Sequence, residues 1–272
     1  MEVRAKKALG QHFLTDQSIA KAIVAALQLR TEDAGGCMDV LEIGPGMGVL
    51  SQYLLERQDV NLKMIEIDTE SVEYLEKHFG KARGRVIYGD FLKLDIDHLF
   101  AGEFNVIGNF PYNISSQIFF RILDYRSRIP QTVCMIQKEV AERIAEKPGS
   151  KTYGILSVLL QAWYDIEYLF TVGSGAFAPP PKVQSAVIRL TRNSRTSLGC
   201  DEDAFKSIVK TSFGQRRKTL RNSLKPLIAA KATREGWDAE ALSSFTAQPV
   251  FELRPERLSV EDFIALTNLL TR

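Results

Sequence analysis

Residues 38–48 read MDVLEIGPGMG, a short apolar run that leads into glycines at positions 44, 46 and 48. The run has the length and composition of a buried strand, and the glycines let the backbone turn tightly and approach a ligand closely. Their GxGxG spacing differs from the GxGxxG that sets a pyrophosphate on a helix N-terminus, and the Glu42 carboxylate would lie close to phosphates held there. The stretch predicts a strand followed by a loop for a cofactor without phosphates, or a tight turn that binds nothing.

Apolar runs and amphipathic patterns alternate around this stretch. Further runs fit buried strands at 61–67, 85–88, 104–108 and 132–137, and helical patterns lie near 49–57, 70–79, 115–124 and 138–146. A leading helix is expected after Asp16, whose side chain can cap the helix N-terminus. The alternation predicts an α/β fold built on a parallel sheet.

The pattern changes after Gly154. A hydrophobic helical run at 155–163 precedes strand-like runs at 165–172 and 185–190, and three prolines between the last two force an extended path. From about Cys200 the pattern is helical to the end. We therefore expect a larger domain over residues 1–195 and a smaller, all-helical one over residues 196–272.

The composition of the 272 residues is that of a globular protein, with 45% hydrophobic residues and a net charge of +2. No run of 18 or more apolar residues could span a membrane, and the N-terminal sequence lacks the apolar stretch of a secretory signal. A cytoplasmic protein is expected. Cys37, Cys134 and Cys200 lie too far apart to suggest a disulfide framework or a zinc site, so no metal is expected.

The basic charge is concentrated in one segment. Nine basic residues and no acidic residue lie between Ala204 and Arg234. Helical spacing predicts that Arg217, Arg221 and Lys225 share one face. Leucines on another face are expected to pack on the domain: Leu220, Leu224 and Leu227. Such a basic face is often only solvated, but the absence of acids favours contact with a phosphate backbone. The candidate RNA-contacting residues are Arg216, Arg217, Lys218 and Arg221.

Two acids stand at the ends of the second and third predicted strands. Glu66 lies 22 residues after Gly44, where α/β cofactor sites place a carboxylate that accepts hydrogen bonds from both ribose hydroxyls. Asp90 could accept from an adenine amino group, although either acid alone is more often a turn residue or helix cap. With Gly44 and Asn109 they mark four successive strand ends, the edge at which parallel sheets bind ligands. Together these residues imply a ligand that contains adenosine but no phosphate, which indicates S-adenosylmethionine as the cofactor.

The segment FNVIGNFPYNISS, residues 104–116, places Asn109-Phe110-Pro111-Tyr112 directly after the fourth strand. An exocyclic amine such as adenine N6 is a poor nucleophile, so a catalyst must orient it and accept its hydrogens. The Asn109 side-chain oxygen and a backbone carbonyl exposed because Pro111 keeps the chain extended are the predicted acceptors. Tyr112 is expected to stack on a base held outside its helix. A strand end with a proline stop and two core aromatics is the alternative.

Nine ordered blocks of the chain resemble the KsgA/RsmA family of small-subunit ribosomal RNA adenine N6-dimethyltransferases. They are KKALGQHFL (6–14), LEIGPGMG (41–48), IEID (65–68), GDFL (89–92), GNFPYNISS (108–116), QKEVAERI (137–144), KTYGILSV (151–158), AFAPPPKVQSAVIRL (176–190) and FGQRRKTLRNSL (213–224). The resemblance implies a Rossmann-like methyltransferase sheet and an N-terminal segment, residues 1–15, that closes over S-adenosylmethionine. The cofactor contacts it implies are His12, Leu14, Gly44, Glu66, Asp90 and Asn109. It also implies that Asn109 faces the target base and that Tyr112 and Phe177 stack on it.

The chain departs from this family at two positions. Many members have Asn at the place of His12 and Leu at the place of Phe110, so a contact through a side-chain amide is not expected at the first position. His12 can still donate or accept a hydrogen bond.

Three functions remain open at this point. The first is dimethylation of two adjacent adenosines near the 3′ end of small-subunit ribosomal RNA, together with a role in subunit biogenesis. The second is methylation of adenine in large-subunit ribosomal RNA or DNA, and the third is RNA binding in ribosome assembly without catalysis. By resemblance, QRRKTLRNSL and PPPKVQSAV favour the first, and Glu66, Asp90 and Asn109 together argue against the third. The expected partner is the small ribosomal subunit or its precursor, and the expected state is a monomer.

Overall fold

The computed structural model describes Val3, Lys6, residues 9–28 and residues 36–272. The chain forms two compact units, Met1–Ala141 with Asp165–Arg192, and Glu142–Tyr164 with Asn193–Arg272. The first unit ends at Arg192, three residues before the expected domain boundary at 195. Residues 142–164, which were expected in the larger domain, group with the C-terminal helices. The reason for this grouping is the apolar helix α6 (Ile155–Gln161), which packs against the C-terminal helices α7 (Glu202–Gly214) and α11 (Val260–Thr271).

The first unit is built on a seven-stranded sheet with the order β4-β3-β2-β5-β6-β9-β7. Its strands are β2 (Met38–Ile43), β3 (Val60–Glu66), β4 (Val86–Tyr88), β5 (Asn105–Asn109), β6 (Gln131–Gln137), β7 (Tyr164–Val172) and β9 (Ser185–Arg192). Strands β2 to β6 pair in parallel, as expected, but β9 runs antiparallel to β6, so the sheet is mixed. A separate pair joins β1 (Phe13–Leu14) to β8 (Phe177–Ala178).

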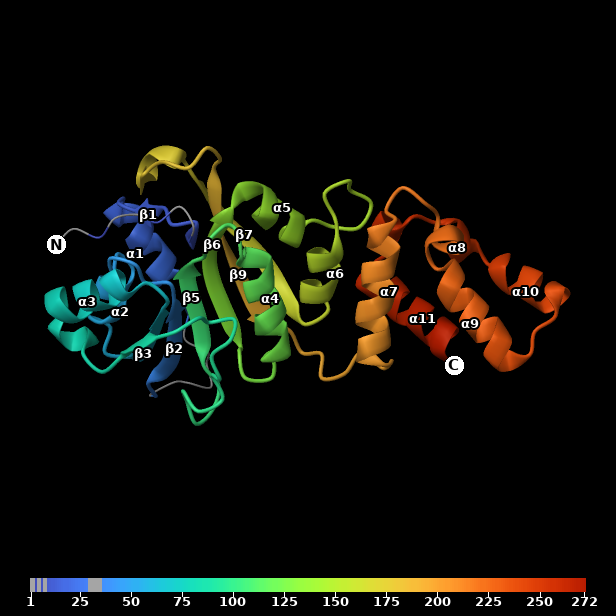
Figure 1. Cartoon of the computed structure of the whole chain (residues 1–272), viewed down its shortest axis with the longest axis horizontal. Helices are drawn as coiled ribbons and strands as arrows, with labels where there is room; N and C mark the ends of the chain where they lie inside the picture. The colour runs from blue at the N-terminus through green and yellow to red at the C-terminus, as the bar shows by residue number, and fades with distance from the viewer. Residues whose placement is uncertain (1–2, 4–5, 7–8, 29–35) are drawn as a thin grey trace. The chain divides into compact units, whose positions relative to one another are not determined.

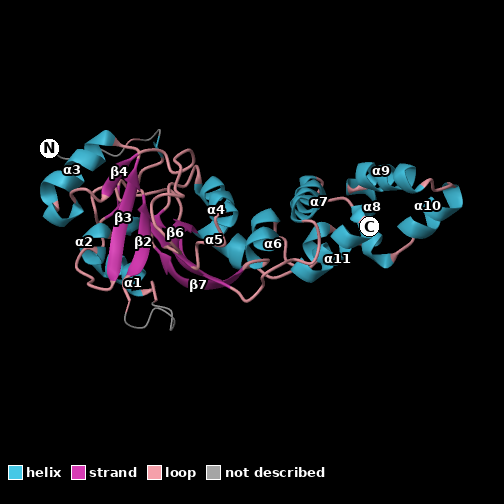
Figure 2. Ribbon diagram, turned by 90° about the horizontal axis from the view of Figure 1, so that it is seen from below, coloured by secondary structure: helices cyan, strands magenta, loops and turns pink. Residues whose placement is uncertain are grey.

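Helices cover both faces of this sheet (Figures 1 and 2). They are α1 (Gln17–Ala25), α2 (Ser51–Leu54), α3 (Thr69–His78), α4 (Ser115–Asp124) and the first part of α5 (Lys138–Ala145). Alternate strand residues such as Val40, Leu62 and Met64 form one core cluster with α1 and α2. Asp16 caps α1 as predicted, because its Oδ1 accepts from the Ser18 and Ile19 amides at 2.9 and 3.2 Å.

The sheet positions the site through the loop after β2. Gly44, Gly46 and Gly48 have φ angles of 66°, 56° and 80°, in the left-handed region that other residues rarely adopt. At Gly48 a Cβ would also lie 2.7 Å from the ring of Phe79, so a larger residue there would force side chains of α3 and its C-terminal cap to shift. The predicted tight turn after the first strand is therefore present.

The second unit is helical. Beside α6, α7 and α11 it contains α8 (Leu220–Ser223), α9 (Lys225–Glu235) and α10 (Ala239–Thr246). The described residues also form short 3-10 helices, among them η3 (Gly80–Ala82) and η4 (Ser174–Ala176) in the first unit and η5 (Pro249–Glu252) and η6 (Pro255–Arg257) in the second. Side-chain caps begin three of the longer helices: Asp201 for α7, Asp238 for α10 and Ser259 for α11.

The prediction that Arg217, Arg221 and Lys225 share one helical face was wrong. Helix α7 ends at Gly214 and α8 has only four residues, so Arg217 lies in the turn between them and does not share a helical face with Arg221 and Lys225. Leu220 and Leu224 are fully buried, as the pattern predicted. The leucine spacing therefore indicated burial correctly although no continuous helix carries it.

Candidate methyl-transfer site

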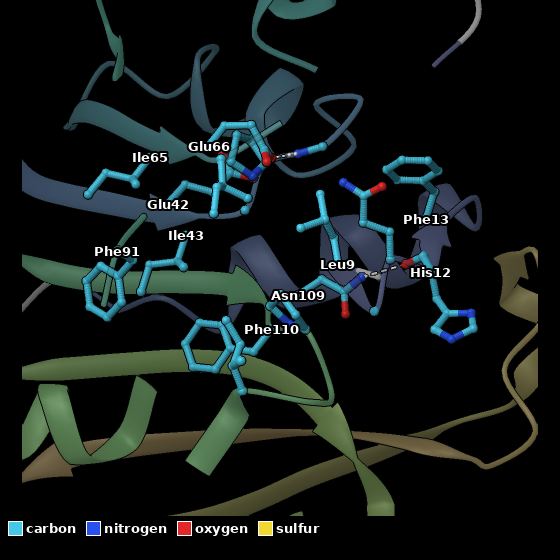
Figure 3. A pocket seen from close by; sticks show the side chains of 18 of the residues that line it. Leu9, His12, Phe13, Glu42, Ile43, Ile65, Glu66, Phe91, Asn109 and Phe110 are labelled. Carbon is cyan, nitrogen blue, oxygen red and sulfur yellow. Dashed lines mark hydrogen bonds between the residues drawn. The ribbon is translucent and has the colours of Figure 1, made fainter. Parts of the chain in front are cut away.

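A cavity of about 210 Å³ opens at the carboxyl ends of β4, β3, β2 and β5. Its walls come from five short segments of the first unit: residues 9–14, 42–50 except Gly48, 65–67, 89–92 and 109–114. Figure 3 shows side chains from four of these strand ends and from the N-terminal segment facing one space. The predicted residues that line it are His12, Leu14, Gly44, Glu66, Asp90, Asn109, Pro111 and Tyr112.

Glu66 is held rigidly at the end of β3. Its carboxylate accepts from the amides of Gly46, at 3.0 Å, and Asp68, at 2.9 Å, and the residue is 3% exposed. Burial raises the pKa of the Glu66 carboxyl, and the backbone amides oppose that shift. A carboxylate fixed in this way retains lone pairs for the hydroxyls of a ligand in the cavity.

Glu42 is the second buried acid of the cavity. It is 1% exposed and accepts a hydrogen bond from the Ser51 hydroxyl at 2.6 Å. Burial raises the pKa of Glu42 to about 8, the Ser51 hydrogen bond lowers it, and the charge of Glu66 raises it further. The side chain is therefore mostly protonated at neutral pH, and it contributes a neutral wall near a charged neighbour.

Asp90 begins the turn after β4. Its Oδ1 accepts from the Leu92 amide at 2.9 Å, and its side chain is 27% exposed. Arg121 of α4 donates to the carbonyl of Leu94 and lies over the ring of Phe91, 5.7 Å from its centroid. The turn that presents Asp90 is thus fixed from the neighbouring helix.

The charges around the cavity suit a cation better than a phosphate. The lining includes the carboxyl groups of Glu66 and Asp90 beside the neutral Glu42, and no lysine or arginine is among the described lining residues. A Cβ on Gly44 would meet no atom within 4 Å, so the backbone there faces open space. These residues fit S-adenosylmethionine, which carries an adenosine, a sulfonium and an ammonium group but no phosphate.

The side-chain amide of Asn109 has a fixed orientation. Its Nδ2 donates to the carbonyl of His12 at 3.0 Å, a contact drawn in Figure 3. Because a carbonyl can only accept, the nitrogen must face His12 and Oδ1 is the acceptor that remains. The structure therefore gives the cavity an oriented acceptor at the end of β5.

The residues that follow Asn109 divide between the cavity and the core. Phe110 is 1% exposed and meets Phe119 edge to face, so it belongs to the core although its backbone lines the cavity. The ring of His12 stacks on that of Tyr112 with centroids 5.4 Å apart, and the Tyr112 hydroxyl shares a 2.5 Å hydrogen bond with Ser185. The carbonyl of Pro111 accepts from the Ile114 amide at 3.3 Å. The carbonyl of Phe110 is thus the candidate for the second predicted acceptor.

The N-terminal segment lies beside the cavity as far as it is described. Lys6 pairs with Asp68 at 2.5 Å, and residues 9–14 form one wall of the cavity. His12 Nδ1 lies 2.9 Å from the carbonyl of Pro179. The predicted closing segment over residues 1–15 includes 1–2, 4–5 and 7–8, which lie outside the described residues.

Phe177 is not among the residues lining the cavity. It pairs with Leu14 between β1 and β8, is 4% exposed and belongs to the core cluster. A stacking role for its ring would require that ring to leave the core, so the assignment stays a prediction.

Apolar neighbours of the acids were not assigned a role from the sequence. Ile67 follows Glu66 and is 44% exposed although it lines the cavity, and Phe91 follows Asp90. An adenine ring needs apolar contacts beside its polar edges. An apolar residue directly after an acid at a strand end is therefore the sequence signal that could have identified Ile67 and Phe91.

The four predicted RNA-contacting residues lie in the second unit and differ in their surroundings. Arg216 donates to the carbonyl of Ser150, and Arg221 donates to the carbonyl of Thr246 and pairs with Glu252. Arg217 and Lys218 are exposed in the turn between α7 and α8, and neither forms an ion pair with another described residue. These two have the charge most available to an anionic partner.

The described part of the chain has neither a membrane-spanning helix nor a metal-binding cluster. Within residues 9–28 and 36–272, no helix has the length and apolar character to cross a bilayer. The same part of the chain contains no cluster of three or more His, Cys, Asp or Glu side chains that could hold a metal ion.

Comparison with known proteins places these features in context. Residues 2–239 match the family described as ribosomal RNA adenine dimethylase. The chain is 59% identical over 265 residues to ribosomal RNA small subunit methyltransferase A of Parabacteroides distasonis. The aligned region covers 97% of this chain and 93% of that protein. Identity to the protein of the same name from Porphyromonas gingivalis is 57% over 272 residues, with 99% of each covered.

Solved structures show the same architecture. A dimethyladenosine transferase from Plasmodium falciparum superposes with a TM-score of 0.75 at 25% identity, over 94% of this chain and 96% of that one. The 23S rRNA methyltransferase ErmE superposes with a TM-score of 0.64 at 24% identity, over 94% and 99%. The predicted α/β methyltransferase sheet with a helical C-terminal part is confirmed.

Proposed function

The chain belongs to the ribosomal RNA adenine dimethylase family, and we propose that it methylates N6 of two adjacent adenosines near the 3′ end of small-subunit ribosomal RNA. It is an S-adenosylmethionine-dependent ribosomal RNA adenine dimethyltransferase. Relatives named for the small subunit share 53–59% of its residues, whereas the large-subunit enzyme shares 24%. The small subunit is therefore preferred over large-subunit RNA or DNA as the substrate.

The observation that carries the proposal is the oriented amide of Asn109. Its Oδ1 is free to accept at the end of β5, in the same cavity as Glu66 and Asp90. A binding protein without catalysis has no need of an acceptor fixed at that point. This arrangement supports methyl transfer to an amine over the assembly-factor alternative.

Each predicted residue that lines the cavity has a role in this proposal. Glu66 accepts from the ribose hydroxyls and Asp90 from the adenine amino group of the cofactor, and Gly44 lets the backbone approach it. The backbone and side chains of His12 and Leu14 close the cavity from the N-terminal segment. The bound cofactor supplies an electrophilic methyl group.

The acceptor base is held by the segment after β5. Asn109 Oδ1 and the carbonyl of Phe110 accept hydrogen bonds from the two N6 hydrogens, which orients the nitrogen lone pair toward the methyl group, and the methylated nitrogen then releases one of these hydrogens to solvent as a proton. Tyr112 stacks on the base, and Pro111 keeps the preceding carbonyl exposed. A base bound in this way must be outside its helix, because N6 is not reachable for attack within a duplex.

The second unit binds the RNA through its phosphates. Arg217 and Lys218 make direct contacts, whereas Arg216 and Arg221 act from positions partly fixed by their own protein partners. Binding of this kind depends on shape and charge more than on base sequence.

The test is methyl transfer by the wild-type protein and by Asn109→Ala. Labelled S-adenosylmethionine is incubated with small ribosomal subunits that lack the modification, and with large subunits and DNA as controls. Label in dimethyladenosine from small-subunit RNA alone is expected, and Asn109→Ala is expected to lose at least about 10²-fold in rate while it still binds the cofactor. Label in the large subunit or in DNA would refute the substrate, and wild-type turnover by Asn109→Ala would refute the role of the amide.

A cytoplasmic location, a monomeric state and independence of metal complete the proposal. Sedimentation of the purified protein at several concentrations tests the monomer, and activity in the presence of a chelator tests the absence of a metal requirement. A concentration-dependent mass or activity lost with the chelator would contradict these points.

A further inference from the structure

The segment AFAPPPKVQSAVIRL, residues 176–190, is one of the blocks on which the resemblance rests, yet the proposed chemistry uses none of its residues. In the structure this segment contacts both sides of the acceptor site. Its first part pairs with the N-terminal segment through β8 and β1, and the Pro179 carbonyl lies 2.9 Å from His12 Nδ1. Its last part begins β9 at Ser185.

Ser185 is completely buried and lies opposite Gln137 in the antiparallel pairing of β9 with β6. Its hydroxyl is 2.5 Å from the hydroxyl of Tyr112. Ser185 is not among the residues that line the cavity, and its hydroxyl contacts the lining residue Tyr112. Ser185, which lies 73 residues after Tyr112 in the sequence, therefore holds the hydroxyl end of the Tyr112 ring against the sheet.

The other restraint on Tyr112 is the His12 ring, which covers one of its faces. A ring held at its hydroxyl and on one face has its remaining face set in a single orientation. A stacking partner lowers the barrier only if it places the base in line with the methyl group, and small errors in such alignment are costly. The hydrogen bond between the two hydroxyls restrains the hydroxyl end of the Tyr112 ring.

We propose that Ser185 is a positioning residue for the target adenine, acting through its hydrogen bond to the Tyr112 hydroxyl. The proposal rests on the proposed function of Tyr112 as the stacking residue. It assigns to the PPPKVQS block the task of holding the acceptor base, with the cofactor held independently by the opposite strand ends. Loss of the hydroxyl is therefore expected to affect the RNA step and not cofactor binding.

A double-mutant cycle tests the proposal. The wild-type protein, Ser185→Ala, Tyr112→Phe and the double variant are assayed with small ribosomal subunits and labelled S-adenosylmethionine. Each single variant is expected to lose about tenfold in kcat/KM for the subunit, and the double variant no more than either one, since all three lack the same hydrogen bond. Affinity for S-adenosylmethionine is expected to change by no more than about twofold.

Thr132→Val serves as the matched control. Thr132 is a buried hydroxyl of β6 that pairs with Leu190 of β9, and its Oγ1 has no hydrogen-bond partner among the described residues. Removing that hydroxyl is expected to leave kcat/KM unchanged. If Ser185→Ala fails to fold, Tyr112→Phe removes the same bond from the half-buried partner, and its kcat/KM tests the proposal in place of the Ser185 variant.

A second measurement separates positioning from general damage. A short RNA with 2-aminopurine in place of the target adenine reports stacking by its fluorescence, and Ser185→Ala is expected to quench it less than the wild type at saturation. Wild-type kcat/KM in either single variant, or additive losses in the double variant, would overturn the proposal. A wild-type protein that does not methylate small subunits would instead overturn the proposed function.

Discussion

Glu42→Gln is expected to remove a pH dependence from the stability of the first unit. The Glu42 carboxyl is almost completely buried, and burial raises its pKa from 4.5 to about 8. Between these two values the folded protein retains a proton that the unfolded chain releases. The contribution to stability is therefore fully present below about pH 4.5 and is lost as the pH rises through about 8.

The size of the effect follows from proton linkage. When the folded state binds one more proton than the unfolded chain, the free energy of unfolding falls by about 1.4 kcal/mol per pH unit. Over the pH range from 4.5 to about 8 this amounts to roughly 4 to 5 kcal/mol. Gln cannot titrate, and it can still accept a hydrogen bond from Ser51. The wild type is thus expected to lose stability relative to Glu42→Gln as the pH is raised.

Hydrogen exchange of the β2 and β3 amides under mild urea is the suitable measurement, at several pH values from about 5 to about 9. Tryptophan fluorescence would not report this unit, because Trp163 and Trp237 both lie in the second unit. Glu73→Gln, at an exposed position of α3, is the control. A difference in unfolding free energy between wild type and Glu42→Gln that does not vary with pH would refute the reasoning.

Three other changes have expected outcomes. Asp90→Ala removes the carboxylate assigned to the adenine amino group, and we expect about tenfold weaker binding of S-adenosylmethionine by calorimetry. Replacing Arg217 and Lys218 by Ala should weaken binding of small-subunit RNA and reduce the slope of log affinity against log salt by about 1 for each charge. Gly48→Ala should destabilise the first unit by about 1 to 3 kcal/mol, because φ is 80° and the new Cβ would lie 2.7 Å from Phe79.

Matched variants isolate each cause. Asp95→Ala changes an exposed acid of the same turn region and should leave cofactor affinity unchanged. Lys77→Ala removes an exposed charge from α3, and an equal drop in salt slope there would count against a specific RNA surface in the second unit. Gly84→Ala has a φ of 73° but no atom within 4 Å of the new Cβ, so it measures the backbone cost alone. If Gly48→Ala costs no more than Gly84→Ala, steric contact with Phe79 is not the reason for glycine.

The strand ends of the site were predictable from the sequence because parallel strands share one carboxyl edge. Glu66, Asp90 and Asn109 could be assigned to that edge as soon as their strands were recognised, since each stands at or just after the end of an apolar run. The direction of β9 was not predictable in this way, because an apolar run has the same pattern in either direction. The pair β1–β8 was not predicted, since two-residue strands have no periodicity.

The second unit shows where pattern analysis fails for a physical reason. Leu220 and Leu224 indicated burial correctly, but the helix expected to carry Arg217 is interrupted because α7 ends at Gly214. The grouping of 142–164 with the C-terminal helices depends on which surface buries α6, and that is decided by tertiary contacts. The role inferred for Ser185 likewise needs the Tyr112 hydroxyl beside it in space.

The order β4-β3-β2-β5 has a consequence for the length of the ligand that the site accepts. Neighbouring strands lie about 4.8 Å apart, so the four ends from Asp90 to Asn109 span roughly 14 Å. Backbone hydrogen bonds fix that span, and changes in loop length do not alter it. A cofactor held at the β4 end must therefore reach across three strand spacings before its reactive group meets an amine at the β5 end, and a compact methyl donor could not contact both ends at once.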